Sequence, residues 1–195
     1  MNQLELFDHN ILQLAQKYGC DTRHANFVKD QALFLFDSTV NLHNFSNTER
    51  KLLEHACILH DIGMFINEKK HHKHSYYIIK NDLALKEYPK EYKKILALIC
   101  YNHRQKVKSK TFKLKSKDKN VVLVLSAILR LADSFDYSDE EIQIKGIKIE
   151  DSLVKIVVDG YITPVLYNRV ERKGELFLYL FELQKIEIES KVIVS

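Results

Sequence analysis

The chain has 195 residues, and its 30 lysines and arginines against 26 aspartates and glutamates give a formal net charge of +4. Hydrophobic residues make up 46% and charged residues 29%, which is typical of a globular domain and excludes a disordered, collagenous or coiled-coil chain. The length predicts one domain with room for a small annex. Only 5 glycines and 2 prolines favour long helices over the many short strands of a β-sandwich.

Cysteine usage and hydropathy indicate where such a chain would reside. Cys20, Cys57 and Cys100 are odd in number and form no CxxC pair, so we expect no disulfide framework and a cytoplasmic location. The first residues show neither the basic start nor the apolar run of a signal peptide. The longest apolar stretch, residues 121–132, contains Arg130 and is too short to span a bilayer. We therefore expect no membrane partner.

Apolar residues at helical spacing predict a mainly α protein up to about residue 138. In chain order we expect helices over residues 2–18, 21–40, 46–60, 76–83, 89–103 and 121–135, with a His-rich turn at 71–74. Ser46 to Glu49 has the sequence of a capping box, which predicts where the third helix begins. The last helix is the most apolar, so we expect it at the centre of the bundle.

The pattern changes after residue 138, where apolar and polar residues alternate with period two. This alternation predicts strands at 142–145, 147–150, 153–158 and 185–194, with a helix at 164–183 between the last two. The predicted fold is a mainly α helical bundle over residues 1–138 with a small C-terminal α+β annex over 139–195 packed on it. Because residues 141–195 offer no cluster of titratable side chains, we expect no chemistry there.

Positive charge is concentrated in residues 104–119, which hold eight basic residues and one acidic residue. The segment is predicted to be a solvated loop. Since Phe112 is its single aromatic residue, it lacks the pattern that stacks single-stranded nucleic acid, and we expect no nucleic-acid partner. Its position directly after His103 leaves open that it steers polyanions toward that histidine.

Histidines and aspartates occupy inner positions of several predicted helices. His60 and Asp61 close the third helix, His24 lies on the inward face of the second, and Asp133 lies in the apolar central helix. A buried carboxylate is costly without a partner, and a divalent cation would supply one. Such an ion polarises a phosphoryl oxygen and lowers the pKa of a water. The alternative is a polar cluster that satisfies itself within the core.

A second ion would need further ligands. Asp61 could bridge to it, and His71 and His103 are its candidate ligands; the alternative places them in a surface turn and at a helix end. Lys73 and Arg104 flank these candidates and could hold a phosphate, or could be ordinary solvated charges.

The order of His24, His60-Asp61 and Asp133 resembles the signature of the HD superfamily of metal-dependent phosphohydrolases. More closely, the chain resembles the C-terminal HD domain of the exopolyphosphatase/guanosine pentaphosphate phosphatase (Ppx/GppA) family. The matching stretches are Thr22–Ala25, Leu35–Asp37, Leu59–Gly63, His71–Ser75 and Leu129–Asp133. Full-length members carry their polyphosphate-cleaving site in an actin-like part that this sequence does not contain. The resemblance therefore implies an HD domain standing alone, to which the family's activity does not simply transfer.

The expected site consists of the following residues. The candidate metal ligands are His24, His60, Asp61, Asp133, His71 and His103, of which Asp61 and His60 are also the candidate catalytic residues. The candidate substrate-binding residues are Lys73, His74, Arg104 and Arg130. One or two divalent ions per chain are expected, with Mn, Fe, Ni, Zn and Mg all compatible with imidazole and carboxylate ligands.

The predicted function is an HD-type metal-dependent phosphohydrolase acting on a nucleotide, another phosphate ester or polyphosphate. The alternative is a non-catalytic accessory module that binds polyphosphate, an alarmone-like nucleotide or a protein partner. The expected partner of the predicted enzyme is a phosphorylated small molecule or polyphosphate, and a homodimer is left open.

Overall fold

The structure, a computed structural model, describes residues 3–104, 106–137 and 140–191. Its helices are α1 (Asp8–Lys17), α2 (Thr22–Ser38), α3 (Val40–His43), α4 (Asn47–Leu59), α5 (His71–Asn81), α6 (Lys90–Asn102), α7 (Ser116–Asp133) and α8 (Pro164–Leu180). Its strands are β1 (Asp136–Tyr137), β2 (Glu140–Glu141), β3 (Gln143–Glu150), β4 (Leu153–Asp159) and β5 (Lys185–Ser190). Short 3-10 turns occupy Gln3–Phe7, Ile62–Phe65, Leu83–Leu85 and Thr111–Lys113.

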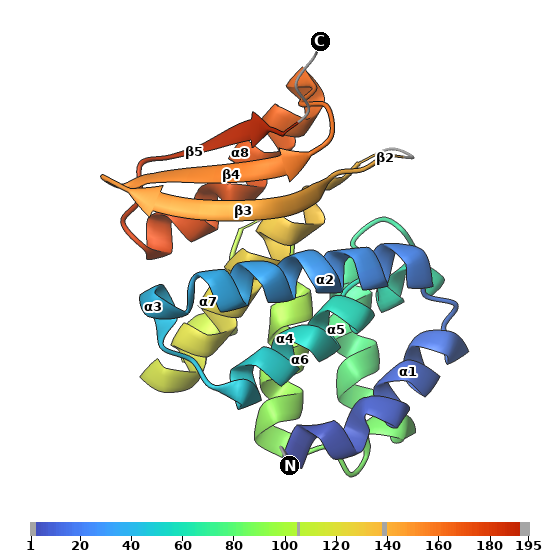
Figure 1. The fold of residues 1–195 in the computed structure, drawn as a ribbon. Helices are drawn as coiled ribbons and strands as arrows, with labels where there is room; N and C mark the ends of the chain where they lie inside the picture. The colour runs from blue at the N-terminus through green and yellow to red at the C-terminus, as the bar shows by residue number, and fades with distance from the viewer. Residues whose placement is uncertain (1–2, 105, 138–139, 192–195) are drawn as a thin grey trace.

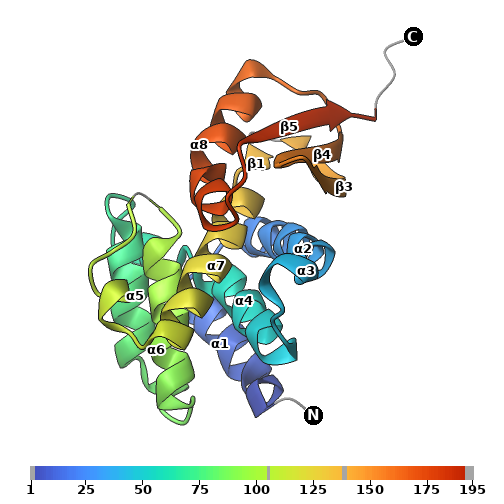
Figure 2. The ribbon, with the colours of Figure 1, turned by 90° about the vertical axis from the view of Figure 1, so that its left-hand side faces the viewer.

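The helices α1 to α7 form one bundle, and the sheet with α8 lies on one end of it (Figures 1 and 2). This arrangement confirms the predicted fold class of a mainly α protein with a small α+β annex. The predicted boundary between residues 138 and 139 falls outside the described residues and stays a prediction. Within the described residues, no helix combines the length and apolar character needed to cross a membrane.

Local sequence signals explain where several helices begin. The Asp21 side chain accepts a hydrogen bond from the His24 backbone N–H at 3.0 Å and caps α2. The predicted capping box of α4 is confirmed, because Glu49 Oε2 accepts from the Ser46 backbone N–H at 2.9 Å. Thr163 caps α8, with Pro164 in its first turn.

The helix α7 lies at the centre, as predicted, and contacts α2, α4, α6 and α8. Two boundaries were predicted wrongly. The segment His71–His74 is the first turn of α5 rather than a turn before it, and α7 begins at Ser116, so it includes the end of the basic segment. Lysines can continue a helix, because their unbranched side chains lose little rotamer freedom there.

The remainder of the basic segment packs against α5 and α6. The Asn102 side chain donates to Thr111 Oγ1 at 2.8 Å and accepts from the Lys108 backbone N–H at 2.8 Å. Lys110 Nζ lies 4.5 Å from the ring centroid of Tyr76. Because Thr111 is fully buried, the prediction of a merely solvated loop is wrong for this part.

The annex is a three-stranded sheet in the order β3-β4-β5. Strand β3 pairs antiparallel with β4, and β4 pairs parallel with β5, so α8 is the connection that the parallel pair requires. The two strands predicted at 142–145 and 147–150 form the single strand β3, with a shift of register between Ile144 and Gly146. The annex joins the bundle where α8 packs on α7 and where Gln31 of α2 accepts a hydrogen bond from the Ile144 backbone N–H at 2.6 Å.

Candidate metal centre

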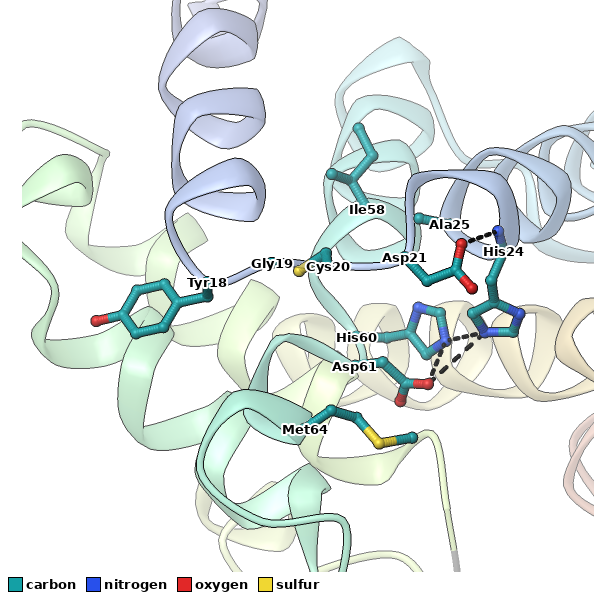
Figure 3. A pocket seen from close by; sticks show the side chains of 10 residues that line it. All are labelled: Tyr18, Gly19, Cys20, Asp21, His24, Ala25, Ile58, His60, Asp61 and Met64. Carbon is teal, nitrogen blue, oxygen red and sulfur yellow. Dashed lines mark hydrogen bonds and ion pairs between the residues drawn. The ribbon is translucent and has the colours of Figure 1, made fainter.

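All six predicted metal ligands lie together, because the ends of five helices meet at one place. His24 lies in the first turn of α2, and His71 is the first residue of α5. His60 and His103 directly follow α4 and α6, and Asp133 is the last residue of α7. The sixth residue, Asp61, comes immediately after His60. In Figure 3, the side chains of His24, His60 and Asp61 point toward one another.

The first group of possible ligands consists of His24, His60 and Asp133, whose ligand atoms all lie within 4.8 Å of one another. The Nε2 atoms of the two histidines are 3.0 Å apart. Asp133 Oδ1 is 3.8 Å from His24 Nε2.

The second group consists of Asp61, His71 and His103. Asp61 Oδ1 lies 3.0 Å from His71 Nε2 and 3.2 Å from His103 Nε2. Its other oxygen, Oδ2, lies 3.5 Å from His60 Nε2 and 3.7 Å from His24 Nε2. Asp61 therefore directs one oxygen toward each group, which is the position of a bridging carboxylate.

Each of the four histidines has an oxygen atom next to its Nδ1. The neighbours are the carbonyl oxygens of Cys57 for His60 (2.7 Å), Glu68 for His71 (3.0 Å) and Cys100 for His103 (2.6 Å), and the carboxylate of Asp136 for His24. Because a carbonyl only accepts, Nδ1 carries the proton in those three rings and the Nε2 lone pair faces inward. This is the usual arrangement of histidines that bind a metal.

The ring nitrogens and carboxylate oxygen that face the centre include no hydrogen-bond donor in the second group. His71 Nε2 and His103 Nε2 are 3.0 Å apart, yet with both protons on Nδ1 they cannot hydrogen bond to each other. Asp61 Oδ1 is buried and has no hydrogen-bond partner within the described residues. A buried acceptor without a donor is costly, so this set of donor atoms fits divalent cations.

Electrostatics keep both carboxylates ionised. Burial alone would raise the pKa of Asp61, but protonation of the adjacent His60, His103 or His71 outweighs burial and holds this pKa far below its usual range. Burial likewise opposes ionisation of Asp133, and Lys173 with His60 lowers its pKa to about 2. Burial lowers the pKa of His103, which favours its neutral form.

Gly63 holds the His-Asp turn against α5. A Cβ atom at this position would lie 2.1 Å from the carbonyl oxygen of His71 and 2.4 Å from the backbone nitrogen of Ser75. The Gly63 N–H donates to Ser75 Oγ at 3.0 Å, and that hydroxyl donates to the His60 carbonyl at 2.7 Å. The glycine thus permits the close approach that brings His71 to Asp61.

A cavity of about 620 Å³, called the basic cavity below, opens onto both ligand groups. The cations among its described lining residues are Arg104, Lys106, Arg130, Arg169, Arg172 and Lys173. Three of these come from α8, so the annex contributes titratable side chains to the wall of this cavity, and the expectation of no chemistry in the annex stays a prediction. Of the four predicted substrate-binding residues, Arg104 and Arg130 line it.

The other two predicted substrate-binding residues lie elsewhere. Lys73 is exposed and His74 half-buried on α5, and neither is among the residues that line the basic cavity. Their neighbour His72 is buried and stacks on Tyr101 at 5.7 Å between ring centroids. Burial, together with Lys108, lowers its pKa to about 4.

Three residues of the site were missed from the sequence. Asp136 holds His24 Nδ1, Lys173 forms an ion pair with Asp133, and Arg169 donates to the carbonyl oxygens of Asp133 and Asp136 at 3.2 Å each. Asp136 could have been found, because it is an acidic residue only three positions after Asp133 in the sequence. Nothing local marks Lys173 or Arg169, since their contacts depend on how α8 packs.

The fold and the site define a class: a helical domain whose helix ends gather two His/Asp groups fit to hold divalent metals, beside a cation-lined cavity. The family model described as Ppx/GppA phosphatase, domain III, matches residues 8–152, and the chain belongs to this family.

Curated relatives of the chain are named guanosine-5'-triphosphate,3'-diphosphate pyrophosphatase. The protein of Aeromonas hydrophila subsp. hydrophila is 30% identical over 126 residues, which are 64% of this chain and 24% of the relative. The protein of Aeromonas salmonicida has the same identity and coverage, and that of Pseudoalteromonas atlantica is 28% identical over 134 residues, 68% of this chain and 26% of the relative. The chain thus spans about a quarter of the length of these relatives.

Proposed function

We propose that this chain is a metal-dependent phosphohydrolase of the HD type, acting on a nucleotide, another phosphate ester or polyphosphate. The observation that carries the proposal is the convergence of four histidine Nε2 atoms on the two oxygens of Asp61, beside the basic cavity. Membership of a phosphatase family and relatives named as nucleotide pyrophosphatases support the same reaction class.

The ligand sets follow from the two groups. His24, His60 and Asp133 would hold one divalent ion, His71 and His103 a second, and Asp61 would contribute one oxygen to each. When bound, such ions supply Lewis-acid chemistry: they polarise a phosphoryl oxygen and lower the pKa of a water. Mn, Fe, Ni, Zn and Mg all suit this set of ligands.

The chain's own residues prepare the site for an anion. Arg130 Nε donates to the Asn102 carbonyl at 2.6 Å, and Arg169 donates to carbonyls at the end of α7, so both guanidinium groups are held at the cavity wall. Burial lowers the pKa of Arg130 to about 10, which leaves it charged at neutral pH. The exposed side chains of Arg104, Lys106 and Arg172 add positive potential at the mouth, which attracts phosphates.

A screen of phosphate esters with Mn²⁺-loaded protein, purified without a histidine tag, tests the proposal. Asp61→Asn should abolish turnover, because both ligand groups lose a carboxylate oxygen. Asp37→Asn is the matched control, since Asp37 pairs with Arg50 on an exposed surface, and this variant should keep the wild-type rate. A metal-loaded wild type that turns over no ester contradicts the proposal.

One observation favours a second candidate, a non-catalytic module that binds polyphosphate, a nucleotide or a protein. The chain corresponds to one domain of the family and to about a quarter of its curated relatives. A wild type that binds tripolyphosphate or GTP in calorimetry without hydrolysing it would support this alternative.

A further inference from the structure

A second cavity reaches the same His/Asp centre from another direction. It has a volume of about 370 Å³ and is called the apolar cavity below. His24, His60 and Asp61 line it, and two of these, His24 and Asp61, also line the basic cavity. Figure 3 shows Ile58, Ala25 and Met64 arranged around these three side chains. A molecule at the centre can therefore extend into both cavities at once.

The two cavities differ sharply in charge. Six lysines and arginines are among the described residues lining the basic cavity, whereas the described lining of the apolar cavity includes none. Among its described lining residues, Asp21 carries the one formal charge outside the shared centre. Burial raises the pKa of Cys20 to about 11, so that thiol is neutral. Beyond the ions that the shared centre would hold, a phosphate in the apolar cavity would face Asp21 with no lysine or arginine among the described lining residues, which is unfavourable.

The size and walls of the apolar cavity suit an uncharged group instead. Ala25, Ile58 and Met64 provide apolar surface, and a cavity of about 150 Å³ lined by such side chains already accepts benzene. A third cavity of about 250 Å³ shares Ala25 and Ile58 with it and extends the apolar wall to Leu12. Room is therefore present for a group at least as large as an aromatic ring.

We propose that the apolar cavity is the leaving-group subsite, which takes the uncharged organic part of a phosphate ester while the phosphate faces the basic cavity. The proposal rests on the proposed function and narrows its substrate to organic phosphates with an aryl- or nucleobase-sized group, in preference to inorganic polyphosphate. A polyphosphate chain is charged at every unit, so any part that extended into the apolar cavity beyond the shared centre would meet Asp21 with no lysine or arginine among the described lining residues. In the hydrolysis, water adds to phosphorus, the P–O bond to the organic group breaks, and that group leaves as an alcohol with one proton of the water.

Binding of two phosphonates, which cannot be hydrolysed, tests the subsite. Calorimetry on Mn²⁺-loaded protein should find phenylphosphonate bound about tenfold to a hundredfold more tightly than methylphosphonate, the range expected for burying one aromatic ring. Ile58→Phe, which fills the cavity, should abolish this preference by excluding the phenyl ring. Ile58→Ala should retain the preference. Leu83→Phe, an added ring at a position 81% exposed, is the control and should behave as wild type.

Equal affinities for the two phosphonates, no binding of either, or an unchanged preference in Ile58→Phe would overturn the subsite. Manganese content and thermal unfolding of each variant show that the centre and the fold are intact. If Ile58→Phe does not fold, Cys20→Leu fills the same cavity from the turn between α1 and α2 and should also remove the preference. The proposed function would fail by a different result. A protein that prefers phenylphosphonate but hydrolyses no ester would support the binding subsite and contradict the proposed phosphohydrolase activity.

Discussion

Lys173 of α8 and Asp133 of α7 form an ion pair in which the side chains are 15% and 11% exposed. The lysine pairs with Asp133 Oδ2, while Oδ1 of the same carboxylate faces His24 at 3.8 Å. The annex therefore supplies a cation to a carboxylate that the bundle buries and that we propose as a metal ligand. Since the lysine and a metal ion would neutralise the same carboxylate, the annex and the metal centre should be energetically coupled.

Lys173→Met tests this coupling. In EDTA the variant should lose about 3–5 kcal/mol of unfolding free energy, because removing one partner leaves a buried charge unpaired. Mn²⁺ should raise its melting temperature more than that of wild type, since the ion restores the missing counter-charge. Arg172→Met, the neighbouring exposed cation on α8, is the stability control. Equal melting temperatures for the two variants in EDTA would disprove the coupling.

The two ligand groups predict a stoichiometry that mutations can resolve. Elemental analysis after dialysis should find two ions per chain in the wild type and one in His103→Gln, because that change affects only the second group. Asp61→Asn should retain neither, since both groups share this carboxylate. His9→Gln, on an exposed histidine, should still bind two. A single ion in the wild type, unaffected by His103→Gln, would show that the second group does not bind metal.

Gly63→Ala should destabilise the protein by about 3 kcal/mol or more, because the added Cβ overlaps the backbone of His71 and Ser75. Since α5 must move to relieve the overlap, manganese affinity should fall as well. Gly146→Ala provides the comparison, as its Cβ would meet only the Val157 side chain at an ordinary 3.7 Å. Urea unfolding and metal titration of both variants decide the matter; similar results for the two would mean that the close approach at Gly63 is unimportant.

The mouth of the basic cavity should steer anionic substrates. Replacing Lys106 and Arg172 by Gln should lower kcat/KM at low salt, with an effect that shrinks as ionic strength rises and exposed charges are screened beyond about 8–10 Å. The kcat should change little, because exposed charges at the mouth do not act selectively on the transition state. Lys113→Gln with Lys115→Gln removes the same charge outside the described cavity lining and should have a smaller effect. Equal losses in the two double variants would attribute steering to net charge alone.

His43 should make stability depend on pH. Its Nδ1 accepts a hydrogen bond from the Phe45 N–H at 3.0 Å and its Nε2 donates to the Phe36 carbonyl at 3.1 Å, so the folded state needs the neutral ring. Burial lowers its pKa below 6.5, and the unfolded state therefore binds the proton more readily. The stability it contributes is complete above pH 6.5 and is lost as pH falls through the lower folded pKa.

Urea unfolding in EDTA at pH 7, 6 and 5 checks this prediction. Wild type should lose more unfolding free energy over this range than His43→Gln, which has no titrating ring at that position. The variant leaves every other histidine in place, so the difference between the two slopes isolates His43. Parallel slopes would show that His43 is protonated as easily in the folded state as in the unfolded state.

Much of this protein could be predicted from local patterns. The capping box at Ser46 and the helical spacing of apolar residues act over about four residues, so they are visible in the sequence. They were sufficient for the mainly α fold and the central position of α7, whereas the choice of the six residues that meet at the centre also rested on the resemblance to the HD superfamily. The same patterns misplaced the start of α5, because the histidines of its first turn resemble a polar turn.

The packing of distant elements decided the remainder. His24 and Asp136 are 112 positions apart, and Lys173 reaches Asp133 across 40 positions, so no local signal links them. Which oxygen of Asp61 faces which histidines depends on where five helices end relative to one another. The division into a basic and an apolar cavity likewise depends on the seating of α8 against α7. Bringing such distant residues together costs chain entropy, and this cost is offset only when the whole core forms. For that reason these contacts are determined by the tertiary structure and not by local sequence.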